Sequence, residues 1–185
     1  MPISETTFRK VALEDPEGHW ELWCGRLQRK PGMTAEHEEL GFELAFELRA
    51  QLDRSQFRVR SDAGRVRRSA ENYFIPDVLV LPTAAARAQF RTGQLAFYSD
   101  PVPLVVEVWS PSTGAYDVNV KLSEYQRRGD LEIWLMHPIE RSLRTWVRHP
   151  DGSYQERRFT GGVVQPTALP GVSIDLSALF ARLDQ

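Results

Sequence analysis

One apolar run with a carboxylate inside it constrains the fold of this chain more than any other feature. Residues 102–109 read VPLVVEVW, and Glu107 is the only charged side chain in the run. Such a β-branched run is typical of a strand that is covered on both faces at the centre of a sheet. Burying an ionised carboxylate is costly unless it is paired or binds a cation. Glu107 is therefore expected to have a partner inside the fold.

A second carboxylate lies at the start of another apolar run. Residues 76–81 read PDVLVL, and a proline is tolerated at the first residue of a strand. Taken alone, Asp77 also suits a strand end at which its carboxylate accepts hydrogen bonds from nearby N–H groups. If the two strands are neighbours, Asp77 and Glu107 converge and offer hard oxygen ligands to Mg²⁺ or Mn²⁺.

Lys121 adds a positive charge near these two acids. A helix is expected from residue 118 to Arg128, with Asp117 as its N-cap and Gly129 as its C-terminal stop. Helical side chains lean toward the N-terminus, so Lys121 in the first turn reaches back toward the preceding strand. Two metal-binding carboxylates and a lysine suit metal-assisted attack of water on a phosphodiester. A lone lysine on a helix is otherwise a solvated surface residue.

A helix further upstream carries one more candidate residue. Thr34 suits the N-cap of a helix that continues to about Leu52, and its leucines recur at every fourth position from Leu40. His37 lies on the same apolar side of this helix. It either reaches the two carboxylates, where it contacts one of them or a phosphate, or is a core histidine bonded to the backbone. Both interpretations stay open.

The remaining pattern predicts a mixed sheet with helices on it. Its elements are a strand at 20–28 that runs into a turn at Pro31 and Gly32, a hairpin of 57–60 and 65–68, a strand at 131–136, a surface hairpin of 143–149 and 153–159, and a short amphipathic helix at 175–183. Glu21 alternates as any strand residue does and is interpreted as structural. No repeat or linker interrupts the chain, so residues 1–185 are expected to form a single domain.

Composition excludes several classes of protein. Hydrophobic residues make up 42% of the 185 residues and charged residues 26%, which excludes a largely disordered chain. No apolar run approaches the roughly 18 residues of a membrane helix, and the charged N-terminus does not resemble a signal peptide. The single cysteine, Cys24, is typical of a reducing cytosol, so a cytoplasmic location is expected.

Charge is distributed unevenly although the net charge is only −2. Residues 54–68 hold six arginines and one aspartate. They suit a surface that contacts phosphate groups, and equally a solvated edge hairpin that discourages pairing with another sheet. The only lysines among the 23 basic residues are Lys10, Lys30 and Lys121, and the interior position of Lys121 is therefore notable.

Three motifs follow one another in a distinctive order: PD at 76–77, EVWSPST at 107–113 and D-x-x-x-K-x-x-x-Y at 117–125. Together with WELWCGRL, GDLEIWLMHP and LPGVSIDLSALF, they resemble the Uma-two family of “putative restriction endonucleases”, within the PD-(D/E)XK nuclease superfamily. The resemblance implies a restriction-endonuclease-like α/β fold, in which a mixed central β-sheet is flanked by α-helices and a β-hairpin is added.

The resemblance also assigns the site. The superfamily's aspartate, second acid and lysine map to Asp77, Glu107 and Lys121. The usual motif has its lysine two residues after the acid, where this chain has Trp109, so the lysine here comes from the following helix. Because a duplex has two strands and each chain has one site, the resemblance further implies a homodimer.

These inferences predict a metal-dependent endonuclease that hydrolyses DNA phosphodiester bonds. Asp77 and Glu107 would hold Mg²⁺ or Mn²⁺, and Lys121 would orient water or stabilise the transition state. Two other classes of function stay open. One is a nuclease-fold protein with little catalytic power that binds nucleic acid or serves in an assembly. The other is a structural module whose buried acids pair with arginine.

Overall fold

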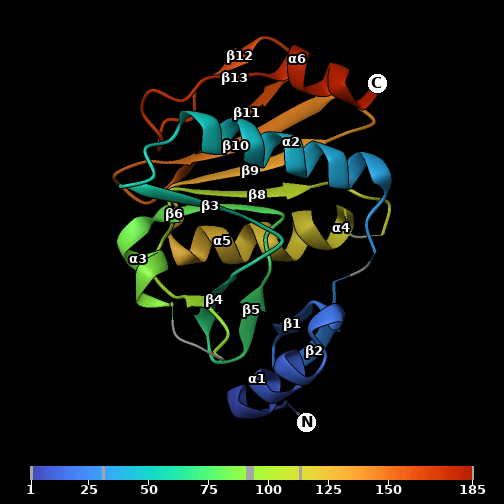
Figure 1. The fold of residues 1–185 in the computed structure, drawn as a ribbon, viewed down its shortest axis with the longest axis vertical. Helices are drawn as coiled ribbons and strands as arrows, with labels where there is room; N and C mark the ends of the chain where they lie inside the picture. The colour runs from blue at the N-terminus through green and yellow to red at the C-terminus, as the bar shows by residue number, and fades with distance from the viewer. Residues whose placement is uncertain (1, 31, 91–93, 113, 185) are drawn as a thin grey trace.

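A six-stranded mixed sheet forms the centre of the molecule (Figure 1). A computed structural model describes residues 2–30, 32–90, 94–112 and 114–184. The strand order is β11-β10-β9-β8-β6-β3, and only β8 and β9 run parallel. The strands are β3 (Phe57–Ser61), β6 (Val78–Pro82), β8 (Leu104–Val108), β9 (Glu132–His137), β10 (Ser142–Arg148) and β11 (Tyr154–Phe159). The apolar runs at 76–81 and 102–109 thus supply adjacent inner strands, as the burial argument requires.

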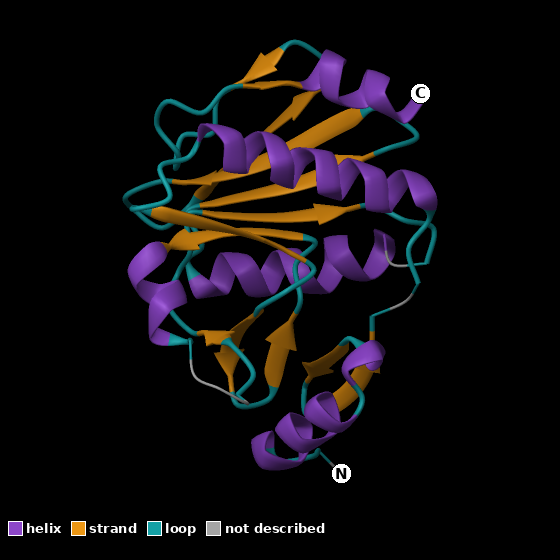
Figure 2. Cartoon of the chain, in the orientation of Figure 1, coloured by secondary structure: helices purple, strands orange, loops and turns teal. Residues whose placement is uncertain are grey.

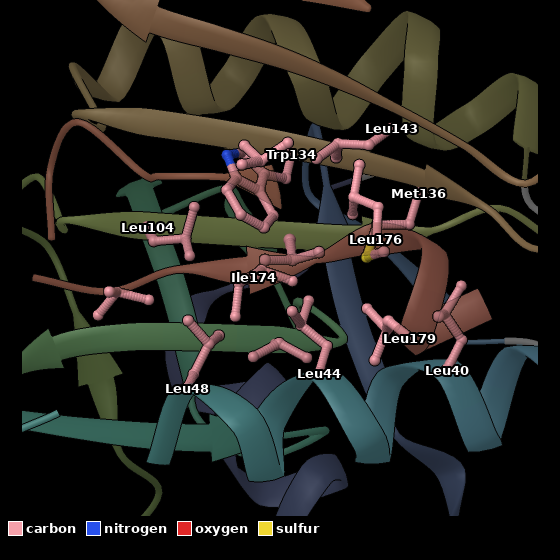
Figure 3. Packing of buried hydrophobic residues seen from close by; sticks show 14 of the residues in the cluster. Leu40, Leu44, Leu48, Leu104, Trp134, Met136, Leu143, Ile174, Leu176 and Leu179 are labelled. Carbon is pink, nitrogen blue, oxygen red and sulfur yellow. The ribbon is translucent and has the colours of Figure 1, made fainter. Parts of the chain in front are cut away.

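Helices cover both faces of this sheet, with α2 (Ala35–Gln51) on one face and α5 (Leu122–Arg128) on the other (Figure 1). Three leucines of the predicted stripe, Leu40, Leu44 and Leu48, are fully buried, and Leu52 at the C-cap is 9% exposed. The stripe packs toward Trp134, Met136 and the C-terminal helix α6 (Leu176–Ala181) (Figure 3). Thr34 is the N-cap, as predicted, and its hydroxyl accepts a 3.3 Å hydrogen bond from the backbone N–H of His37. The cap fixes the start of α2 and therefore the position of His37.

A smaller sheet forms the end of the molecule that contains the N-terminus (Figure 2). Its strand order is β2-β1-β5-β4-β7. The strands are β1 (Trp20–Trp23), β2 (Arg26–Arg29), β4 (Arg65–Ser69), β5 (Asn72–Phe74) and β7 (Phe97–Tyr98). The helix α1 (Glu5–Glu14), which the sequence analysis did not predict, buries Phe8 against Leu22, Tyr73 and Phe97.

Two elements expected from the sequence are wrong, and each involves at least one strand of this smaller sheet. The strand expected at 20–28 is a tight hairpin, because Cys24 and Gly25 adopt left-handed conformations with φ of 49° and 71°. The hairpin expected from 57–60 and 65–68 does not form, since β3 pairs with β6 and β4 pairs with β5 and β7. The two strands bury their apolar residues in different cores, Val59 beneath α2 and Val66 on the α5 side, and so join different sheets.

The helix after β8 has three parts, and the middle part is a π-helical turn between two α-helical ones. It begins as α4 (Gly114–Tyr116), continues as a π-helical turn over Asp117–Lys121 and ends as α5. Asp117 is therefore not an N-cap as predicted, whereas Gly129 ends the helix as predicted, with φ of 81°. π-Helical turns inside α-helices occur frequently at functional sites. In this one, Asp117 pairs with the ammonium of Lys121, which also contacts the buried carboxylate of Glu107.

The C-terminal part agrees with the sequence analysis. The hairpin of β10 and β11 forms at the edge of the central sheet, and the tail helix is α6 (Leu176–Ala181), capped by Asp175. The other elements are α3 (Thr83–Ala88), β12 (Val163–Val164), β13 (Ile174–Asp175) and single 3₁₀ turns at Pro16–Gly18 and Arg182–Asp184. None of the described helices has the length and apolarity needed to cross a membrane.

Candidate functional site

Asp77 and Glu107 face each other across two neighbouring strands. Val78 of β6 pairs with Val106 of β8, and the same antiparallel register carried one residue further sets Asp77 opposite Glu107. The backbone N–H of Val108 donates a 2.6 Å hydrogen bond to Oδ2 of Asp77. Only 2% of Asp77 and 3% of Glu107 is exposed, and both line the same small cavity. The structure therefore brings the two carboxylates together in the interior.

Lys121 lies fully inside this carboxylate cluster. Its Nζ is 3.1 Å from Oε2 of Glu107, 3.2 Å from Oε1 of Glu21 and 3.3 Å from Oδ1 of Asp117. Burial alone lowers the pKa of the Lys121 ammonium, but the three carboxylates outweigh it and raise that pKa well above its usual value. A lysine from the helix therefore reaches the acid on the strand and carries its positive charge there.

Two further side chains hold Asp77 in place. Nζ of Lys30 is 2.6 Å from Oδ1 of Asp77 and 2.5 Å from Oδ1 of Asp62. Nε2 of His37 is 3.0 Å from Oδ2 of Asp77, so His37 contacts one of the carboxylates, the first of its two interpretations. Burial raises the pKa of the Asp77 carboxyl, but Lys30 and the hydrogen bond to His37 hold it well below its usual range. Asp77 is thus an oriented, ionised carboxylate.

Sequence reasoning missed four members of this cluster. Glu21, interpreted as a structural strand residue, is buried, accepts a 2.8 Å hydrogen bond from the N–H of Ile75 and pairs with Lys121. Tyr125 donates a short hydrogen bond from its hydroxyl to Oε1 of Glu107. Lys30 and Asp117 are the other two. One signal was present: in a chain that otherwise uses arginine, two of three lysines lie in the cluster.

Trp109 occupies the position at which the related motif has its lysine, but it does not join the cluster. Its indole ring stacks on the imidazole of His137, with ring centroids 4.2 Å apart and planes 15° from parallel. Trp109 follows β8 directly and His137 ends β9, so the stack joins the ends of the two parallel strands. Position 109 therefore carries no lysine, and the ammonium that contacts Glu107 comes from Lys121 on the following helix.

The cluster contains more negative than positive charge. Four buried carboxylates, Glu21, Asp77, Glu107 and Asp117, surround the two ammonium groups of Lys30 and Lys121. Burial, together with the neighbouring charges of Asp77 and Asp117, raises the pKa of Glu107 well above its usual value. Within the described residues, Oδ1 of Asp117 is buried and accepts no hydrogen bond, and the Lys121 ammonium 3.3 Å away is shared with Glu21 and Glu107. The site is therefore short of positive charge.

This donor set fits a hard divalent cation held in part by its substrate. Among the described residues, no group of three or more histidine, cysteine or acidic side chains has the arrangement of a complete metal site. Mg²⁺, however, is commonly bound through one or two carboxylates together with water and substrate phosphate oxygens. The facing carboxylates of Asp77 and Glu107 could supply two such ligands, and the excess of negative charge would favour a cation there.

Comparisons with known proteins identify the family and the fold. The model of the Uma2 family, described as “Putative restriction endonuclease”, matches residues 6–177. A solved structure described as a “putative nuclease belonging to DUF820”, from Anabaena variabilis, is 18% identical to this chain. The similarity covers 98% of this chain and 99% of that chain, with a TM-score of 0.79, and confirms the predicted fold class. A search of curated proteins found no match.

Proposed function

The chain belongs to the Uma2 family, and on that basis we propose that it is a metal-dependent endonuclease that hydrolyses the phosphodiester bonds of DNA. The observation that carries this proposal is the buried pair of Asp77 and Glu107, from adjacent strands, with the ammonium of Lys121 beside it. Facing carboxylates and a cation of fixed position are what hydrolysis of a phosphodiester requires, because negative charge develops on the phosphate as water attacks.

Each side chain then has a definite task. Asp77 and Glu107 would hold Mg²⁺ or Mn²⁺, which supplies positive charge to the phosphate and to the attacking water. Lys30 and His37 fix the two oxygens of Asp77, and Tyr125 fixes one oxygen of Glu107. Lys121 is held by three carboxylates, so its ammonium has a fixed position from which it would offset charge on a phosphate oxygen once the substrate has entered.

The small volume of the cavity at the site favours a second candidate function. The cavity between the carboxylates and lysines measures about 10 Å³, which holds about one water molecule. A phosphodiester needs more room, so the wall formed by Met33, His37 and Ser110 must open for the substrate. A protein that keeps the site closed would bind nucleic acid without cutting it, or would serve in an assembly.

Incubation with supercoiled plasmid DNA separates these two functions. We expect nicked and then linear DNA when Mg²⁺ or Mn²⁺ is present, and unchanged plasmid in EDTA. Single-stranded DNA and RNA tested alongside define the substrate class. If the folded protein cuts none of these nucleic acids with either metal, yet binds DNA equally well in EDTA, the endonuclease proposal is wrong and the binding function replaces it.

We also propose that the protein acts as a homodimer, because the described residues of one chain form one such cluster and a duplex has two strands to cut. Sedimentation velocity at micromolar concentration is expected to return twice the mass of the 21.2-kDa chain. A monomer mass that persists when a DNA duplex is added would contradict the dimer, and would leave single-strand nicking as the activity to expect.

A further inference from the structure

A second polar cavity lies between the C-terminal end of α2 and the edge strand β3. Its volume is about 70 Å³, several times the roughly 10–15 Å³ that one water molecule needs. Four of its seven lining residues are arginines, and none is acidic. The lining residues are Arg49, Leu52, Arg54, Phe57, Arg58, Val59 and Arg60. We call this cavity the arginine pocket.

The guanidinium groups of the arginine pocket lack anionic partners. Within the described residues, none of the four forms an ion pair or donates a side-chain hydrogen bond, and Nε of Arg58 is buried without an acceptor. Arg60 lies over the ring of Phe90, 5.9 Å from its centroid, which leaves its N–H donors available. An unsatisfied buried donor is costly, and four like charges around one cavity repel one another.

The other arginines of 54–68 are engaged elsewhere, so the basic segment divides into two groups. Arg65 donates to the carbonyl of Trp20, Arg67 to Glu5, Ser99 and Tyr73, and Arg68 to Glu124. These bonds lie within the smaller sheet or between it and its neighbouring helices. The second group, in the arginine pocket, has no such structural role. Arg49 lies in the last turn of α2, where its positive charge interacts favourably with the helix dipole. This interaction does not explain Arg54, Arg58 and Arg60, which lie beyond the helix.

We propose that the arginine pocket binds a phosphate group. Phosphate offers several oxygens to forked guanidinium donors, and arginine is the side chain best suited to that geometry. A bound phosphate would satisfy Nε of Arg58 and relieve the repulsion among the four positive charges. The pocket is lined by two exposed arginines, Arg49 and Arg54, and two half-buried ones, so a phosphate can enter from solvent.

The strand β3 connects this pocket to the carboxylate cluster. It continues from Arg58 through Ser61 to Asp62, whose carboxylate contacts Lys30 of the cluster. At about 3.3 Å per residue, Arg58 and Ser61 are about 10 Å apart along β3, a distance that one nucleic-acid backbone can bridge. The geometry thus favours a backbone phosphate of a nucleic acid that also reaches the cluster. This choice of phosphate source rests on the proposed function, whereas the phosphate site does not.

DNA binding measured without metal tests the proposal. Fluorescence anisotropy of a labelled duplex in EDTA compares the wild-type protein with Arg54→Gln/Arg58→Gln and with Arg157→Gln, a control on β11 at the opposite edge of the sheet. We expect the double variant to bind about tenfold or more weakly and to lower the salt slope by about two, whereas the control binds as wild type. Arg49→Gln, on the exposed surface of α2, gives a second variant that folds normally.

Calorimetry with inorganic phosphate distinguishes the source of the phosphate. If wild type binds phosphate, the double variant does not, and DNA binding is the same in both, the pocket serves a free phosphate or a phosphomonoester. If neither DNA nor phosphate binding differs from wild type in any pocket variant, the proposal is wrong. A protein that never cuts DNA but binds it through the pocket would contradict the proposed activity and support this site.

Discussion

Replacing Lys121 by methionine is expected to lower the free energy of unfolding by about 3–5 kcal/mol, because it strands buried carboxylates without their counter-charge. Nζ of Lys121 lies within 3.3 Å of an oxygen of Glu21, of Glu107 and of Asp117. Methionine has a similar length, so the loss reports charge more than packing. Urea unfolding at pH 7, followed by circular dichroism, measures the effect.

Two controls make this result specific. Lys10→Met removes a lysine whose side chain is 73% exposed and pairs with Glu14 at 3.8 Å, so it should change stability by less than about 0.5 kcal/mol. Adding Glu107→Gln to Lys121→Met removes one stranded carboxylate and should restore part of the loss. A loss for Lys121→Met no larger than that of Lys10→Met would mean that the cluster is not a buried ionic network.

The parts of the fold that sequence reasoning predicted correctly are those with a local or energetic cause. α2 follows from a leucine every fourth residue and a capping Thr34. The two inner strands follow from apolar runs that need cover on both faces. The meeting of Asp77 and Glu107 follows from the cost of burying either carboxylate alone. The elements themselves follow from their own residues, whereas the meeting of the two carboxylates also required the two strands to be neighbours, as they are.

The parts that it missed depend on contacts between distant segments. Lys30 and Asp77 are 47 residues apart, and nothing near either residue indicates the other. Interpreting 20–28 as one strand hid the turn at Cys24 and Gly25, where the chain folds back. The turn residues 62–64 predict a reversal but not a partner, and each flanking strand pairs with a strand of a different sheet, β3 with β6 and β4 with β5.

The π-helical turn explains the incomplete site prediction on the helix side. An α-helix capped by Asp117 would direct that carboxylate to the backbone N–H groups of its own first turn. The π-helical turn directs Asp117 to the ammonium of Lys121 instead. No residue pattern in 117–121 distinguishes the two geometries, so the tilt of Lys121 was predictable and the role of Asp117 was not.

Glu107→Gln is expected to abolish metal binding while it leaves the folded state intact. The substitution keeps the shape of the side chain and removes one of four buried negative charges, so the metal-free protein should be as stable as wild type or more stable. Replacing a residue that only hydrogen-bonds to a metal ligand weakens metal binding by about 10–100-fold. Replacing the ligand itself should therefore weaken metal binding by more than about 100-fold. Glu132→Gln is the matched control, because Glu132 is a buried carboxylate on the adjacent strand β9 that contacts Trp134 and the N–H of Ala168.

Titration calorimetry with Mn²⁺ therefore tests the central claim most directly. The titration is made on the protein alone and on the protein saturated with a short DNA duplex, because substrate phosphates complete the coordination of such ions. We predict binding to wild type and to Glu132→Gln, stronger with DNA, and none to Glu107→Gln. Equal binding to all three proteins would place the metal elsewhere. No binding to folded wild type, with or without DNA, would contradict a metal-dependent nuclease site at Asp77 and Glu107.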